Sequence, residues 1–125
     1  MDQLMAIQPE RPVILCLSRA GLAIARRLAE VIDGDIHGHA VRCPDAPYHF
    51  GKATPHIADL FCSGRPVIGI CAAGILIRAV APHLRHKGTD APVIAVSESG
   101  NVAVPLVGGH HGAITLARRV ADALT

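Results

Sequence analysis

Short hydrophobic runs alternate with amphipathic segments along the whole chain. Runs rich in Val, Ile and Leu predict five strands, at 13–17, 35–40, 67–71, 92–96 and 102–104. Apolar positions three and four residues apart predict helices at 21–33, 54–62 and 74–84, and a last helix that follows the glycine run 108–112 and ends at Leu124. This alternation predicts a three-layer α/β fold with a flavodoxin-like or Rossmann-like, mostly parallel five-stranded sheet and an antiparallel edge strand.

The chain has the length of one domain. Its 125 residues suffice for a single hydrophobic core. We expect one domain over 1–125, with 1–12 as a flexible lead-in, a loop over 43–52 and a helix cap at Thr54. Half of the residues are hydrophobic and 18% are charged, which excludes disorder. So apolar a domain is expected to cover part of its surface with a second copy, as a homodimer, or with a neighbouring domain.

Charge and composition exclude several classes of partner. A net charge of +2 and only three aromatic residues (Tyr 1, Phe 2) argue against nucleic acid. The longest strongly apolar stretch without a charge, 66–77, is too short for the ~20 residues that span a membrane. Asp2 stands where a signal peptide needs a base, so we expect a cytoplasmic protein. The four cysteines form no C-x-x-C pair, so neither a metal site nor a disulfide framework is expected.

Three glycine-containing junctions each follow a strand and precede a helix. They contain Gly21, Gly74 and the run 108–112. In an open α/β sheet such junctions expose backbone N–H groups and helix N-termini that favour anions. We expect all three at one edge, where a ligand meets the residues Ser18, Gly21, Ala73, Gly74, Gly109 and Gly112. The other explanation of these glycines is close packing of helix on strand.

A few polar side chains lie near the same predicted edge. Glu98 is the carboxylate closest to it, and His110 between glycines is placed as a general base, with His111 beside it. Arg78 is placed either to bind a carboxylate or to extend into solvent. We expect His37 and His39 to face solvent on an edge strand. No dinucleotide fingerprint, P-loop or nucleophile elbow is present.

From 67 to 124 the sequence closely resembles the N-terminal domain of the CbiG family, the cobalt-precorrin-5A hydrolases of cobalamin biosynthesis. The resemblance rests on the segments 73–82 (AGILIRAVAP), 87–93 (KGTDAPV), 97–102 (SESGNV), 109–112 (GHHG) and 116–119 (LARR). The histidine loop departs from the family pattern, because it is one residue shorter and lacks a second glycine and an asparagine. Complete members of the family carry central and C-terminal domains, and some relatives are fused to a methyltransferase.

The resemblance implies a reaction and a substrate. The family opens the ring A δ-lactone of cobalt-precorrin-5A and releases acetaldehyde. The implied substrate is a corrinoid that brings its own cobalt, so no resident cofactor is implied. His110 and Glu98 are the residues expected to be catalytic, with backbone N–H groups of Gly74, Gly109 and Gly112 stabilising the oxyanion. Two other functions stay open: a non-catalytic tetrapyrrole-binding or assembly module, and a plain anion- or nucleotide-binding α/β domain.

Overall fold

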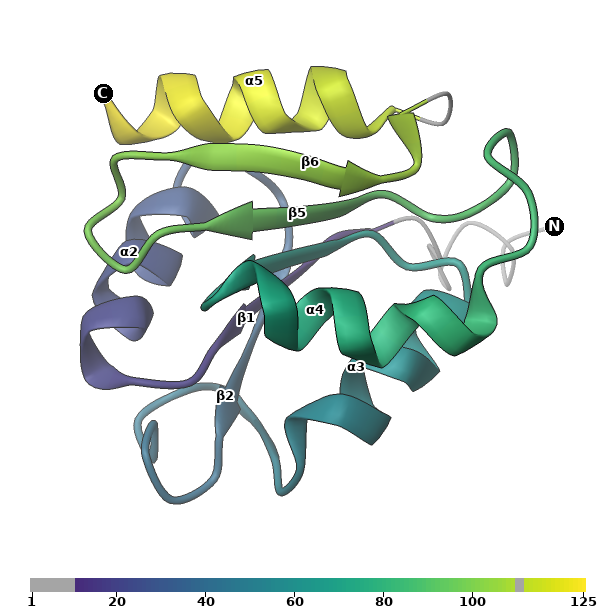
Figure 1. Ribbon diagram of the computed structural model, residues 1–125. Helices are drawn as coiled ribbons and strands as arrows, with labels where there is room; N and C mark the ends of the chain where they lie inside the picture. Colours follow the sequence, from purple (N-terminus) through teal and green to yellow (C-terminus); the bar gives the residue numbers. More distant parts are fainter. Residues whose placement is uncertain (1–10, 110–111) are drawn as a thin grey trace, which may run out of the picture.

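The described part of the chain folds into a six-stranded sheet with two helices on each face (Figure 1). The computed structural model describes residues 11–109 and 112–125. Its strands are β1 (Val13–Cys16), β2 (Asp35–His39), β3 (Tyr48–Phe50), β4 (Val67–Ile70), β5 (Val93–Val96) and β6 (Ala103–Val107). Its helices are α2 (Arg19–Ala29), α3 (Ala53–Cys62), α4 (Ala73–Val80) and α5 (Ala113–Leu124), with a 3₁₀ turn at Ala81–His83.

The sheet has the order β3-β2-β1-β4-β5-β6. Five strands are parallel, and β6 returns antiparallel to β5, with Val93 opposite Val107 and Val96 opposite Ala103. The predicted mostly parallel α/β sheet with an antiparallel edge strand is therefore confirmed. The strand that sequence reasoning missed is β3, which extends the sheet beyond β2 within the predicted loop.

Alternate residues of the central strands build two separate hydrophobic layers. Ile14, Ile68 and Ile94 face α2 and α5, which cover them with Leu28 and Val120. On the other face lie the buried residues Val13, Leu15, Val67, Val93, Ile57, Leu60, Leu76 and Val80, from β1, β4, β5, α3 and α4. This alternation explains why all four β1 residues are fully buried although a strand shows two faces.

Two local expectations are corrected. The cap of α3 is Lys52 without a side-chain bond, so Thr54 is not the cap. Residues 11 and 12 belong to the fold rather than to a lead-in, because the Arg11 guanidinium pairs with Asp33 at 2.6 Å and Asp35 at 3.1 Å. Residues 1–10 lie outside the described part.

The expectation that His37 and His39 face solvent on an edge strand is corrected: both are half-buried, because β3 pairs outside β2. The Nδ1 of His37 lies 2.8 Å from Nε2 of His56, and the His56 ring stacks on Phe50. Burial, and then the charge of a protonated His56, lower the pKa of His37 to about 4. The charge of Arg65 accounts for a smaller part of this lowering, and the charge of Asp35 opposes it. The neutral ring is therefore the form that the fold stabilises.

Acid is expected to weaken the fold through this histidine. A histidine in the unfolded chain titrates near 6.5, so between that pH and about 4 the unfolded state binds the extra proton. The stabilisation is complete above pH 6.5 and is lost as pH falls toward 4. Because water reaches part of the ring and screens its charge, we expect a loss of about 1–2 kcal/mol.

Urea unfolding between pH 7 and pH 4.5 checks this expectation. The variant His37→Gln should lose stability less steeply over this range than the unmodified chain. An equal slope in both proteins would show that His37 does not carry the effect.

In the part of the chain that the structure describes, no helix is long and apolar enough to cross a membrane.

Candidate functional site

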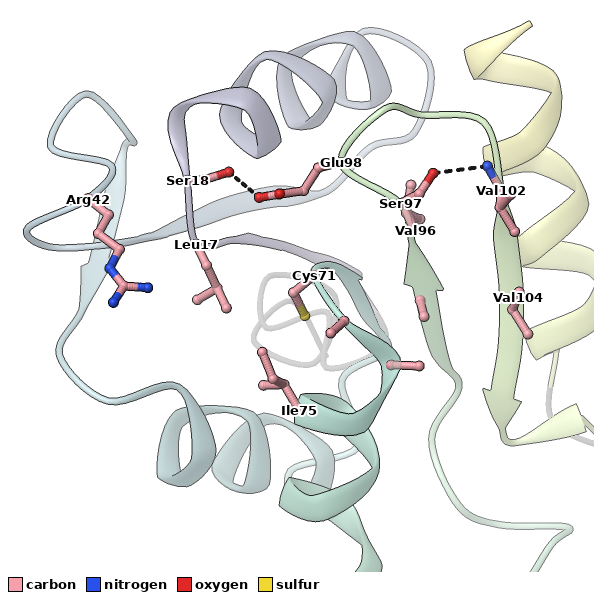
Figure 2. Close-up of a pocket in the computed structure, with 13 residues that line it drawn as sticks. Leu17, Ser18, Arg42, Cys71, Ile75, Val96, Ser97, Glu98, Val102 and Val104 are labelled. Atoms are coloured by element: carbon pink, nitrogen blue, oxygen red, sulfur yellow. Dashed lines mark hydrogen bonds between the residues drawn. The ribbon is translucent and has the colours of Figure 1, made fainter.

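A cavity of about 550 Å³ opens at the carboxyl ends of β1, β4 and β5 (Figure 2). The chain leaves the neighbouring strands β1 and β4 in opposite directions, toward β2 and toward β5. Such a switch in strand order is where open α/β sheets bind ligands. The cavity is lined by Leu17, Ser18, Arg42, Cys71, Ala72, Ala73, Ile75, Ala95, Val96, Ser97, Glu98, Val102 and Val104.

Ser18 and Glu98 meet at the polar side of this cavity. Ser18 is the N-cap of α2, and its Oγ accepts a hydrogen bond from Gly21 N at 3.0 Å. The same hydroxyl donates to Oε2 of Glu98, across 80 positions of sequence. Glu98 is exposed in the turn between β5 and β6. The first turn of α2 thus orients the serine, and the serine holds one oxygen of the carboxylate.

Gly21 contributes to the site through this serine rather than by close approach to a ligand. A Cβ placed at Gly21 would lie 3.3 Å from the Cβ of Cys16 and 3.4 Å from the Cγ2 of Ile70. The absence of a side chain therefore lets α2 pack on β1 and β4, which is the packing explanation of this glycine.

The first turn of α4 forms another wall of the cavity. Ala72, the N-cap, has no side chain that accepts a bond from the helix, and Ala73 lies beside it in the wall. The backbone N–H groups of Ala73 and Gly74 are therefore available to an anion. Arg78 is exposed in the last turn of α4, and its Nη1 lies 3.8 Å from where a Cβ of Gly74 would be. It thus reaches back toward the helix start but does not line the cavity.

Cys71 directly follows β4, lines the cavity and carries a neutral thiol. Burial, and then the negative charge of Glu98, raise the pKa of Cys71 to about 11. A thiolate nucleophile needs a lowered pKa, so this environment does not favour one at neutral pH.

The pairing of Cys71 with Glu98 gives a test that needs no substrate. Removing the charge in Glu98→Gln should lower the pKa of Cys71 and raise its alkylation rate by iodoacetamide at pH 9 by about threefold. Peptide mapping by mass spectrometry separates Cys71 from the exposed Cys62. Glu30→Gln, at the far end of α2, is the matched control and should change nothing. An alkylation rate of Cys71 that is the same in Glu98→Gln and in the unmodified chain would contradict the proximity of Cys71 and Glu98.

The third glycine junction lies at the opposite edge of the sheet, so the prediction that all three junctions share one edge is wrong. Because β6 is antiparallel, its end at Val107 lies beside the start of β5. A Cβ at Gly108 would be only 2.8 Å from Cα of Pro92. Gly109 lines a separate hollow of about 430 Å³ with Lys87 and Asp90. Gly109 and Gly112 are thus not part of one oxyanion site with Gly74.

His110 and His111 lie outside the described residues, so their predicted roles stay predictions. The structure instead adds residues that sequence reasoning missed. Arg42 lines the cavity from the loop after β2, and Val102 and Val104 line it from the other end (Figure 2). Only their positions in the sequence could have indicated them: Arg42 follows the end of a predicted strand, and the two valines belong to the predicted edge strand.

The fold and the cavity define a doubly wound α/β domain with a cavity at the carboxyl edge of its sheet. The family model described as "Cobalamin synthesis G N-terminal" matches residues 55–125. The chain belongs to this family. Glu98 and the start of α4 lie inside the matched range, and Ser18 lies before it.

Known relatives are longer than this chain. A "Cobalt-precorrin-5A hydrolase" of Salmonella typhimurium is 29% identical over 107 residues, which are 85% of this chain and 30% of the relative. One of Priestia megaterium, with the same description, is 36% identical over 75 residues, which are 59% of this chain and 20% of the relative. The chain therefore spans about a third or less of the curated relatives that it matches.

A solved structure supports the fold. The crystal structure of a cobalamin biosynthesis protein G homologue from Sulfolobus solfataricus matches with a TM-score of 0.62 and 22% sequence identity. The match covers 92% of this chain and 34% of that one. The doubly wound arrangement described above is thus shared with a longer protein.

Proposed function

We propose that this chain is the N-terminal domain of a cobalt-precorrin-5A hydrolase, and that the carboxyl-edge cavity binds the lactone end of the corrinoid. The observation that carries the proposal is the Ser18–Glu98 pair at the switch point of the sheet. The membership of the chain in the family and the description of its longer relatives supply the substrate.

Lactone opening needs an activated water and a group that stabilises the carbonyl oxyanion. Glu98 supplies the base. Ser18 occupies its Oε2, which leaves Oε1 free to accept a proton from water. The water oxygen then bonds to the lactone carbonyl carbon, the ring C–O bond breaks, and the leaving oxygen takes the proton back from Glu98. The N–H groups of Ala73 and Gly74 are the donors proposed for the oxyanion. Lactone opening leaves a hydroxyl on the two-carbon unit. When the carbon–carbon bond between this unit and the macrocycle breaks, the macrocycle keeps the electron pair and takes up the hydroxyl proton, and the unit leaves as acetaldehyde.

The apolar part of the cavity suits the flat face of a tetrapyrrole. Ile75, Val102 and Val104 line it, and the two valines are 54% and 43% exposed. On this face α4 contacts β5, while α5 covers the opposite face of β6. A volume of about 550 Å³ holds one edge of a macrocycle rather than the whole. The open side is therefore where the remaining part of a longer hydrolase would complete the enclosure.

The same openness favours a second function, a tetrapyrrole-binding module that does not catalyse by itself. Mixing the purified chain with cobalt-precorrin-5A, while following the visible spectrum and acetaldehyde, separates the two. A spectral change with acetaldehyde supports the hydrolase, and a spectral change without it supports the module. Thermal stabilisation by mononucleotides but not by the corrinoid would contradict both.

A further inference from the structure

The loop between β2 and β3 is held rigidly at the carboxyl edge. The ring Nδ1 of His39 accepts hydrogen bonds from the backbone N–H groups of Val41 and Arg42, each at 3.2 Å. Cys43 and Ala46 are buried in the core on the α2 side. They pack so closely on Gly38 that a Cβ there would lie 2.5 Å from Ala46. The backbone of Arg42 is thus fixed where its side chain enters the cavity wall.

Arg42 lines the cavity with a guanidinium that lacks the contacts made by four other arginines of the fold. Arg11 and Arg65 form ion pairs with Asp33 and Asp35. Arg26 and Arg27 donate to the backbone carbonyls of Asp45 and Leu124. Arg42, within the described part of the chain, has neither kind of side-chain contact, although Glu98 belongs to the same cavity. In Figure 2 the guanidinium and the Ser18–Glu98 pair lie apart on the cavity rim.

This arrangement places one cation and one carboxylate at separate points of a largely apolar cavity. A guanidinium binds a carboxylate through two parallel hydrogen bonds, a geometry that an uncharged amide cannot match. A nucleotide would bring several phosphate charges, and the wall offers a single guanidinium. The wall therefore fits a ligand with an apolar body and a carboxylate on its edge.

We propose that Arg42 binds a side-chain carboxylate of the corrinoid and makes the cavity selective for a free-acid corrinoid over its amidated counterpart. This role rests on the proposed function in one respect, the binding of a corrinoid. Arg42 touches the substrate away from the lactone, so it sets affinity and specificity rather than the chemical step.

A titration of the purified chain with two corrinoids tests the proposal. The two share one ring system, and their side chains are free carboxylates in one and primary amides in the other. Absorption in the visible range reports binding. The unmodified chain is expected to bind the acid at least about tenfold more tightly than the amide. Arg42→Gln should weaken binding of the acid by about 10- to 30-fold and leave binding of the amide within about twofold. Arg42→Lys keeps the positive charge but cannot form the two parallel hydrogen bonds of a guanidinium. It should therefore bind the acid more tightly than Arg42→Gln does and less tightly than the unmodified chain.

The controls separate this role from folding and from the proposed function. Arg119→Gln, exposed on α5 across the sheet, should bind both corrinoids like the unmodified chain. Two results, in a chain that binds the acid, overturn the role of Arg42 and leave the proposed function standing. In one, Arg42→Gln leaves that affinity unchanged, and in the other it weakens binding of both corrinoids equally. A chain that binds neither corrinoid overturns the proposed function together with this role.

Discussion

Replacing Glu98 with glutamine is expected to lower the rate of lactone opening by about 10²-fold or more, because general-base catalysis contributes that much. Glutamine keeps the shape of the side chain and can still contact Ser18, so corrinoid affinity should change by less than about threefold. The rate of acetaldehyde release at saturating cobalt-precorrin-5A measures the effect. Where the chain needs the rest of a longer hydrolase, the comparison is made with the part of the Salmonella typhimurium relative that lies outside the match added to the assay.

Glu30→Gln is the matched control for this loss, since Glu30 is an exposed carboxylate at the other end of α2. Its rate should equal that of the unmodified chain. Ser18→Ala, which frees Oε2 of Glu98, should reduce the rate less than Glu98→Gln does, because the serine positions the base and does not replace it. A Glu98→Gln variant that retains the rate within threefold while binding the corrinoid would contradict the role of Glu98.

The largest expected loss of stability follows Gly108→Ala, at about 3 kcal/mol. Gly108 has φ of +81°, which costs an alanine about 1 kcal/mol. The new Cβ would also lie 2.8 Å from Cα of Pro92 and 2.9 Å from the carbonyl oxygen of Ala91, and such overpacking against backbone adds about 2 kcal/mol. Urea unfolding monitored by circular dichroism measures the change.

Gly112→Ala is the comparison that isolates the steric part. Gly112 has φ of +99°, but a Cβ there would meet nothing within 4 Å. It should lose about 1 kcal/mol, from backbone strain alone. Equal losses at the two glycines would contradict the close packing of Gly108 on the start of β5, and with it the placement of this junction at the amino edge.

The order of strands and helices was predictable because each central strand is a short run of Val, Ile and Leu. The strand β3 was not, because Tyr48–Phe50 has only three residues between prolines and a glycine. Its stabilisation comes from pairing with β2 and from the packing of Phe50 on His56. Neither contact leaves a periodic signal in the sequence.

The site was predictable only in part. Ser18 and Glu98 each follow a strand, and the parallel order of β1 and β5 brings them to one edge. The prediction that the third glycine junction shares the carboxyl edge is wrong for a physical reason. An antiparallel strand ends where its parallel neighbours begin, so β6 ends at the opposite edge of the sheet. An antiparallel edge strand, as the sequence predicts, therefore separates Gly109 and Gly112 from Gly74. Arg42 was missed because only the tertiary fold places the loop after β2 beside β1.

Chemical-shift mapping tests most directly the central claim that a corrinoid binds at the carboxyl edge. The chain, at 13.1 kDa, is small enough for amide spectra to be followed during titration with the free-acid corrinoid. The shifts are expected to concentrate at Ser18, Arg42, Ala73 and Glu98 and to spare Lys87 and Gly109. Shifts that instead concentrate at Lys87 and Gly109 would contradict this account and place the ligand at the opposite edge.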